Sequence, residues 1–391
     1  MSKPGSGIHI TQGQITGLGA AMPVAGACVG ALFFGWLTDR FGRKKLFMIT
    51  LGVYPASTAL TALSFAPWWF FLFRFLTGLG IGGEYASINS AIDELIPSRH
   101  RGRIDIIING TYWAGAAVGA LITVPATNDL PVAVGWRVCF GLGVVLGLVV
   151  LLVRRNVPES PRWLFVHGRD REAEDLVTGI EHEVEQETGT HLGEPRQSIT
   201  IRQRKTISPW TIFLTLTTRY PRRAILGFSL FIGQAFLYNA ITFGYAQILT
   251  VFFHIKTDPG YYFAVIAVGN LFGPLILGRL FDSLGRKPMI AGAYILSGVL
   301  LLLTAWLFNA GDLSATTAAG GITGPLLFST LVSTGKVSDT VIAFSVGATL
   351  MILAGLVEAF LGVKAERKGL EEIASPLTAE DADRSVGARA G

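Results

Sequence analysis

The sequence of 391 residues is short of charge and of cysteine. Charged side chains make up 15 % of it, whereas soluble globular proteins carry about 25 %. The two cysteines, Cys28 and Cys139, both lie inside apolar runs, which argues against a disulfide framework or a cysteine metal site. The net charge of +5 is small and dispersed. A nucleic-acid partner is therefore not expected.

Motifs of catalysis and of nucleotide binding are also missing. The sequence contains no Gly-x-x-x-x-Gly-Lys-Ser/Thr, no His-Glu-x-x-His and no Gly-x-Ser-x-Gly. Ser333 and Lys336 have a Ser-x-x-Lys spacing, but they fall in a polar turn, and we interpret the match as accidental. ATP-driven transport is therefore not indicated, an integral-membrane enzyme is only the second choice, and no metal or cofactor is expected.

Long apolar runs are what the sequence has in abundance. A bilayer core about 30 Å thick requires roughly 20 apolar residues per helix. The runs are continuous rather than alternating, which predicts helices and not strands. We predict membrane-spanning helices at about 16–38, 46–66, 68–92, 104–126, 132–153, 224–254, 260–281, 288–310 and 341–363.

A basic motif occurs twice, each time after such a run. The first copy is Gly35-x-x-x-Asp39-x-x-Gly42-Arg43-Lys44, and the second, 243 residues later, is Gly278-x-x-x-Asp282-x-x-Gly285-Arg286-Lys287. This repeat predicts two related halves, at 1–153 and 224–391, joined by a polar segment at 154–223. Residues 170–188 carry apolar side chains at helical spacing among many acids, which predicts a surface helix.

Basic residues gather in every second loop. Arg40, Arg43, Lys44 and Lys45 follow the first predicted span, and further basic groups follow the third, fifth and seventh. Loops of this kind lie on the cytoplasmic side. We therefore expect a multi-pass protein of the plasma (inner) membrane, with the basic loops and residues 154–223 in the cytoplasm.

Three motifs together resemble the major facilitator superfamily, in its sugar-porter and metabolite–proton symporter branches. They are the doubled basic loop, Arg74-Phe-Leu-Thr-Gly-Leu-Gly-Ile-Gly-Gly-Glu-Tyr85, and Pro158-Glu-Ser-Pro-Arg-Trp-Leu164. The resemblance implies an all-α membrane bundle of two halves and secondary active transport of a small metabolite, an organic acid or sugar-like. It further implies proton-coupled symport by alternating access, with the substrate, protons and the bilayer as partners. No obligate protein partner is inferred.

The resemblance also points to helices that this sequence lacks. In the family the doubled loop follows helices two and eight of twelve, whereas here it follows the first span. We therefore expect about 9–10 helices, without the family's first helix and with a shortening near 317–318. The run at 318–332 is short for a span, so we expect an incomplete crossing, with the last span ending on the cytoplasmic side. A truncated family member that does not transport is the alternative function.

Polar residues inside the apolar runs are the candidates for a substrate or proton pathway. Ionisable groups at membrane depth are costly and usually functional. We expect Arg74 to attract an anionic group and Glu84 to carry a proton, with structural pairing as the alternative. Further candidates are the polar residues Asp105, Asn109, Gln234 and Asn239, which either line a wet route or hydrogen-bond between helices.

By resemblance, the basic loops lock the two halves together on the cytoplasmic side and release them as access alternates. The alternative is that their charge only sets orientation. The candidate gating residues are Gly35, Asp39, Arg40, Gly42, Arg43, Glu159 and Arg162 in the first half, and Asp282, Gly285 and Arg286 in the second.

Overall fold

A computed structural model describes residues 5–11, 14–15, 17–95, 98–154, 158–189, 208–252, 254, 259–310 and 337–363. In these ranges all regular structure is helical. The long helices are α2 (Leu18–Phe41), α3 (Arg43–Ala62), α4 (Pro67–Leu95), α5 (Ser98–Asn128), α6 (Val132–Arg154), α10 (Pro221–Val251), α11 (Pro259–Ser283), α12 (Arg286–Ala310) and α15 (Val337–Leu361). Shorter elements are α7 (Pro161–Val166), α8 (Asp170–Thr188), α9 (Pro209–Leu214) and the π-helical turn Thr215–Arg219.

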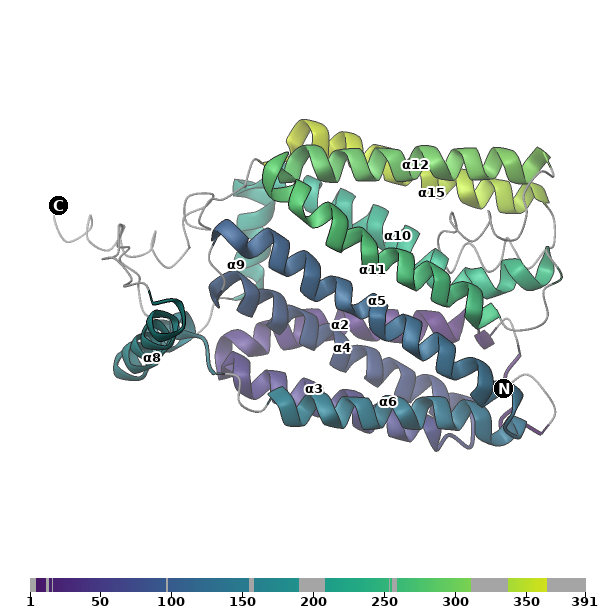
Figure 1. Cartoon of the computed structure of the whole chain (residues 1–391), viewed down its shortest axis with the longest axis horizontal. Coiled ribbons are helices and arrows are strands. Elements are labelled where there is room, and N and C mark those ends of the chain that lie inside the picture. Colours follow the sequence, from purple (N-terminus) through teal and green to yellow (C-terminus); the bar gives the residue numbers. More distant parts are fainter. Residues whose placement is uncertain are drawn as a thin grey trace.

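The predicted helices are confirmed within a few residues at each end. Helix α8 has the bounds that the amphipathic pattern predicted. The long helices run side by side, and α8 lies beyond one end of the bundle (Figure 1). The predicted run at 318–332 and the shortening near 317–318 lie outside the described residues.

Helices α2 and α4 touch backbone to backbone. A methyl group built on Gly26 would lie 2.0 Å from the carbonyl oxygen of Phe75, and one on Gly30 would lie 2.1 Å from that of Leu79. From the other side, a methyl group on Gly78 would lie 1.9 Å from the carbonyl oxygen of Pro23. Only glycine allows this approach, as expected for close helix packing in lipid. The residue numbers of the paired positions increase together along both helices, so α2 and α4 run parallel.

Other glycine contacts give the directions of further helices. Gly80 and Gly83 of α4 face Tyr54 and Thr50 of α3, in that order, so these two helices are antiparallel. Gly143 and Gly147 of α6 face Thr58 and Pro55 of α3, which makes that pair antiparallel as well. Helix α11 packs along α5, and Gly260 at its start faces Val124 and Ala120 near the end of α5, so these two helices are antiparallel as well. All four predicted basic loops therefore join helix ends on one side of the bundle.

The Gly-x-x-x-Gly spacings of α5 and α11 do not form close contacts. No atom lies within 4 Å of a methyl group built on Gly115, Gly119, Gly269 or Gly273, in the part of the chain that the structure describes. The Gly-x-x-x-Gly spacing occurs often by chance in glycine-rich helices, and here it marks open helix faces. The spacing alone therefore does not predict close packing at these four positions.

The outer surface of the bundle is apolar. Five described helical segments are long and apolar enough to cross a membrane: Leu18–Phe41, Ile104–Asn128, Val132–Leu152, Arg286–Leu307 and Thr340–Leu361. Large apolar side chains such as Leu32, Phe231 and Phe360 are well exposed. Apolar patches of this extent need a lipid environment. The chain is a multi-pass membrane protein.

Residues 5–11 pack onto the bundle at the end opposite the motif loops. Ile8 and Ile10 are buried against Phe70 and Trp136. The Trp136 indole donates a hydrogen bond to the Ser6 carbonyl (3.2 Å), and Arg137 donates to the carbonyls of Ser6, Ser64 and Ala133. Arg137 lies within an apolar helix, and the sequence reading did not select it.

Candidate functional site

The first motif loop, residues 35–44, breaks the chain between two helices at a glycine. Gly42 has φ +96°, and it separates the end of α2 at Phe41 from the start of α3 at Arg43. In the second motif loop, residues 278–287, Gly285 has φ +100° directly before α12. Residues other than glycine rarely adopt such backbone angles. The repeat seen in the sequence is therefore also a repeat of backbone geometry.

The carboxylate of Glu159 binds the start of α3. Its Oε1 accepts a hydrogen bond from the Arg43 backbone N–H at 2.8 Å, and both oxygens accept from Lys44 N–H at 3.3 and 3.2 Å. Glu159 also accepts from the Ser160 N–H at 3.0 Å. The first N–H groups of a helix have no partner within it and attract negative charge. Glu159 therefore caps α3 from a segment more than 100 residues away in the chain.

Helix α7 holds Glu159 in place. The Ser160 hydroxyl caps α7 by accepting from Trp163 N–H at 3.1 Å. The Trp163 indole donates to the Asp39 carbonyl at 3.1 Å, and its ring stacks on His167 at 4.1 Å between centroids. The motif Pro158–Leu164 is thereby fastened to both sides of the first motif loop, the end of α2 and the start of α3.

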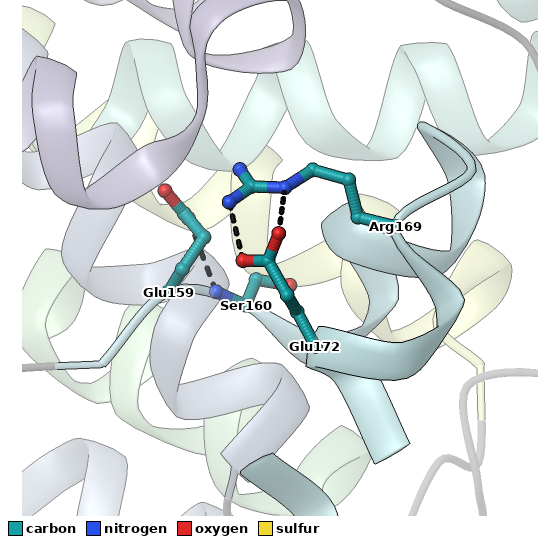
Figure 2. A network of polar contacts seen from close by, with 4 residues as sticks. All are labelled: Glu159, Ser160, Arg169 and Glu172. Carbon is teal, nitrogen blue, oxygen red and sulfur yellow. Dashed lines mark hydrogen bonds and ion pairs between the residues drawn. The ribbon is translucent and has the colours of Figure 1, made fainter. Parts of the chain in front are cut away.

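An exposed ion pair lies at the start of α8, between its N-cap residue Arg169 and Glu172. The Arg169 guanidinium makes a bidentate contact with the Glu172 carboxylate, beside Glu159 and Ser160 (Figure 2). The hydrogen bond to Glu172 raises the pKa of Arg169. Both side chains are solvent-exposed. Exposed pairs of this kind contribute little to stability.

Arg74 and Glu84 lie inside the first group of helices, α2 to α6. Both are on α4, and both are half-buried. The Arg74 guanidinium carbon lies 5.6 Å from the ring centroid of Phe140 on α6. Tyr54 of α3 is an electrostatic neighbour of both Arg74 and Glu84. Ten residues of helix separate Arg74 from Glu84, about 15 Å, so they do not pair with each other. Tyr54 packs on Gly80, which lies between the two charged residues along α4.

Aromatic rings join α5 to α10 across the bundle. Tyr238 of α10 lies 6.1 Å from the Tyr112 ring and 5.8 Å from the Trp113 ring, between centroids. Tyr112 is also an electrostatic neighbour of Tyr54. The rings of Tyr112, Trp113 and Tyr238 therefore form one aromatic cluster between α5 and α10.

The other predicted pathway residues are placed less uniformly. The Asn109 amide donates to the Asp105 side chain at 2.9 Å and to its carbonyl at 3.0 Å, so this pair bonds within α5. Gln234 is exposed on α10. The side chains of Asn239 and Asp282 lie outside what the structure describes. The candidate pathway is therefore represented by Arg74 and Glu84 of the first half.

The remaining gating candidates also lie at the motif-loop end. Asp39 and Arg40 are exposed near the end of α2, and the Arg40 guanidinium lies 5.4 Å from the Phe41 ring centroid. Gly35 is half-buried on α2, and Arg162 and Arg286 are half-buried at the starts of α7 and α12. Of the predicted set, Asp39, Gly42, Arg43 and Glu159 are brought together.

Sequence reasoning missed several residues of this region. Tyr54 and Tyr238 are single polar aromatic residues in apolar runs, and nothing in their spacing marks them. Glu358 was missed although it is an acid inside an apolar run, which is the signal that selected Glu84. Within the described ranges, no three His, Cys, Asp or Glu side chains are placed to hold a metal ion.

A family model described as "Sugar (and other) transporter" matches residues 6–336. The niacin transporter NiaP of Acinetobacter baylyi is 30 % identical over 270 residues, which cover 68 % of this chain and 58 % of the relative. The putative metabolite transport protein YdjK of Escherichia coli is 30 % identical over 306 residues, covering 74 % and 63 %. The chain thus spans about three fifths of the length of these relatives. Their names are those of transporters and not of enzymes, in line with the expectation from the sequence.

Solved structures share the fold. The xylose transporter XylE from E. coli, in a partially occluded inward-open conformation, aligns with a TM-score of 0.60 at 18 % identity, covering 94 % of this chain and 91 % of that chain. The proton:xylose symporter XylE bound to 6-bromo-6-deoxy-D-glucose aligns equally well, at 17 % identity. The predicted fold class, an all-α major-facilitator bundle, is confirmed. The chain belongs to the sugar (and other) transporter family of the major facilitator superfamily.

Proposed function

We propose that the chain is a secondary active transporter of a small metabolite, coupled to protons in symport and working by alternating access. The observation that carries the proposal is the pair of charges on α4. Arg74 and Glu84 interrupt the apolar stretch 68–92 of α4, and Tyr54 packs on Gly80, which lies between them along the helix. Charged groups at membrane depth are retained where they serve a pathway.

The substrate is a small organic acid or a sugar-like compound. Arg74 offers a fixed positive charge beside the Phe140 ring, which favours a planar anion. The relative named as a niacin transporter supports an organic acid, because niacin is a planar carboxylate. The structural neighbours named for xylose support the sugar-like choice. The polar residues Asp105, Asn109, Gln234 and Asn239 are the further candidates along the route.

The motif loops gate the cytoplasmic side. Residues 1–153 and 224–391 form the two moving halves, residues 154–223 connect them, and the basic loops face the cytoplasm of the cell. Glu159 supports this role, because hydrogen bonds to the backbone of α3 form and break without covalent change. The proposed cycle alternates between a closed cytoplasmic side, with these contacts made, and an open one.

Uptake into proteoliposomes tests the proposal. The purified chain is reconstituted, and uptake of labelled niacin and of labelled D-xylose is measured with and without an inward proton gradient. We expect the gradient to accelerate uptake of one of them. Glu84→Gln is expected to retain exchange at equal concentrations but to lose accumulation, because exchange requires no net proton movement. Arg74→Ala is expected to abolish uptake of the anion.

Glu174→Gln, which neutralises an exposed acid on α8, is the matched control and should behave like the unaltered chain. A folded protein whose uptake ignores the proton gradient contradicts symport. Absence of both uptake and exchange, across a panel of organic acids and sugars, contradicts the transport proposal itself.

A further inference from the structure

Glu358 is a buried carboxylate that belongs neither to the proposed pathway nor to the first motif loop. It lies near the end of α15, and only 3 % of its surface is exposed. Its helical segment, Thr340–Leu361, is apolar enough to cross a membrane. An acid in such a helix is costly to keep and calls for a partner.

The packing of α15 on α12 places Glu358 near the second motif loop. A methyl group on Gly298 of α12 would lie 2.9 Å from the Ala348 carbonyl oxygen, and one on Gly355 would lie 3.0 Å from that of Ala291. The residue numbers of the contacting positions increase on one helix as they decrease on the other, so α12 and α15 are antiparallel. One turn beyond Gly355, α15 reaches the first turn of α12, which begins at Arg286.

The partner at that turn is Lys287. It lies four residues before Ala291, on the face of α12 that packs on α15, so its positive charge attracts the Glu358 carboxylate across that turn. The attraction acts through space, since no direct ion pair joins these two described side chains, and it falls slowly with distance in a medium of low dielectric. Tyr294 of α12 is the other titratable neighbour of Glu358, and its hydroxyl donates to the Leu230 carbonyl at 3.0 Å.

The two motif loops thus have corresponding acidic partners. Lys287 is the residue that corresponds to Lys44 in the repeat. The carboxylate of Glu159 binds the start of α3 at Arg43 and Lys44. Glu358 lies against the start of α12, where the second copy of the motif ends. In each case the acid comes from a segment outside the loop.

We propose that Glu358 is a positioning residue that holds the second motif loop against α15 through Lys287. Its role in alternating access rests on the proposed function, but its hold on the loop does not. Neutralising either charge loosens the start of α12 and exposes the loop. Neutralising both has no further effect, because the attraction is already lost.

The test measures alkylation of one cysteine in the second motif loop. Leu284 is well exposed there, and Leu284→Cys is the reporter in a chain that also carries Cys28→Ser and Cys139→Ser. Glu358→Gln and Lys287→Gln are each expected to raise the alkylation rate about tenfold, and together no more than either alone. The exchange of charges, Glu358→Lys with Lys287→Glu, is expected to restore the slow rate, as is Lys287→Arg.

Two controls separate this effect from general loosening. A second reporter in the first motif loop, Phe41→Cys, should keep its rate in all these variants. Asp129→Asn, at the opposite end of the bundle, should leave both reporters unchanged. Additive effects, no restoration on charge exchange, or equal acceleration of both reporters overturns the proposal. If Glu358→Gln does not fold, an unchanged rate in Lys287→Gln overturns it equally.

Uptake is measured separately on the unaltered chain. If the coupling between the two charges holds and uptake is absent, the transport proposal fails and the role of Glu358 in the loop stands. If uptake is present and the charges act independently, the inference about Glu358 fails alone.

Discussion

Gly42 of the first motif loop is required to be glycine for two separate reasons. Its φ of +96° is strained for any other residue, and a methyl group there would lie 2.6 Å from Oε2 of Glu159. The glycine is therefore needed twice, once for the turn between α2 and α3 and once to admit the carboxylate. The turn and the acid that caps it are parts of one arrangement.

At this scale we predict that Glu159→Ala destabilises the protein. The Arg43 and Lys44 N–H groups lose their acceptor, and loss of a helix cap costs about 1–2 kcal/mol. The midpoint of thermal unfolding in detergent should fall accordingly. Glu172→Gln is the matched control, because it removes the exposed carboxylate that faces Arg169. Equal midpoints for Glu159→Ala and the control would contradict a capping role.

The sequence predicted some of these residues and not others, for physical reasons. Arg74 and Glu84 are visible because a charge interrupts an apolar run. Glu159 was selected only through family resemblance, since its hydrogen bonds go to backbone atoms that leave no trace in the pattern of side chains. Tyr54 was missed because a tyrosine in an apolar helix is ordinary, and only the fold packs it on Gly80, between the two charged residues of α4.

At the scale of the element, glycine spacing decides how closely two helices approach. The pair α2 and α4 share a contact in which glycines on each helix face main-chain carbonyls of the other. The same spacing on α5 and α11 faces open space in the described part of the chain. Spacing alone did not distinguish the two cases, because it reports what a helix face permits and not what lies opposite.

We predict opposite outcomes for alanine at the two kinds of glycine. Gly78→Ala places a methyl group 1.9 Å from the Pro23 carbonyl oxygen, so α2 and α4 must separate, and overpacking of this kind costs about 1–3 kcal/mol or more. Gly115→Ala meets no neighbouring atom of the described residues. The yield of monodisperse protein in detergent and its unfolding midpoint should fall for Gly78→Ala only.

Gly119→Ala, one turn further along α5, is a second control and should also be tolerated. A midpoint for Gly78→Ala that matches both controls would show that α2 and α4 are not in backbone contact. Helix propensity favours alanine over glycine by about 1 kcal/mol, so the tolerated variants are expected to be slightly more stable.

At the scale of the whole molecule, the helix directions and the loop charges agree. Charge alone predicted which loops share a side, and the glycine contacts independently bring the same loops to one end of the bundle. The end of α15 lies there too, because α15 is antiparallel to α12. Most of this architecture was predictable from apolar runs and basic loops, whereas the packing of residues 5–11 was not, since no periodic pattern marks that segment.

We predict that the two ends of the bundle label from opposite sides of the membrane. In a chain with Cys28→Ser and Cys139→Ser, Glu183→Cys on α8 and Asp129→Cys between α5 and α6 are tested in separate variants. A membrane-impermeant maleimide added to right-side-out vesicles should react with Asp129→Cys and spare Glu183→Cys. Inside-out vesicles should give the reverse. Labelling of both from one side would overturn the proposed orientation.

The backbone contact between α2 and α4 also affects whether protons can leak across the membrane between these helices. Where main-chain atoms of two helices touch at Gly26, Gly30 and Gly78, no water molecule fits between them, and a file of water is what a proton needs to cross unaided. The seam between these helices is therefore closed to ions. The proposed pathway past Arg74 and Glu84 therefore lies outside this seam.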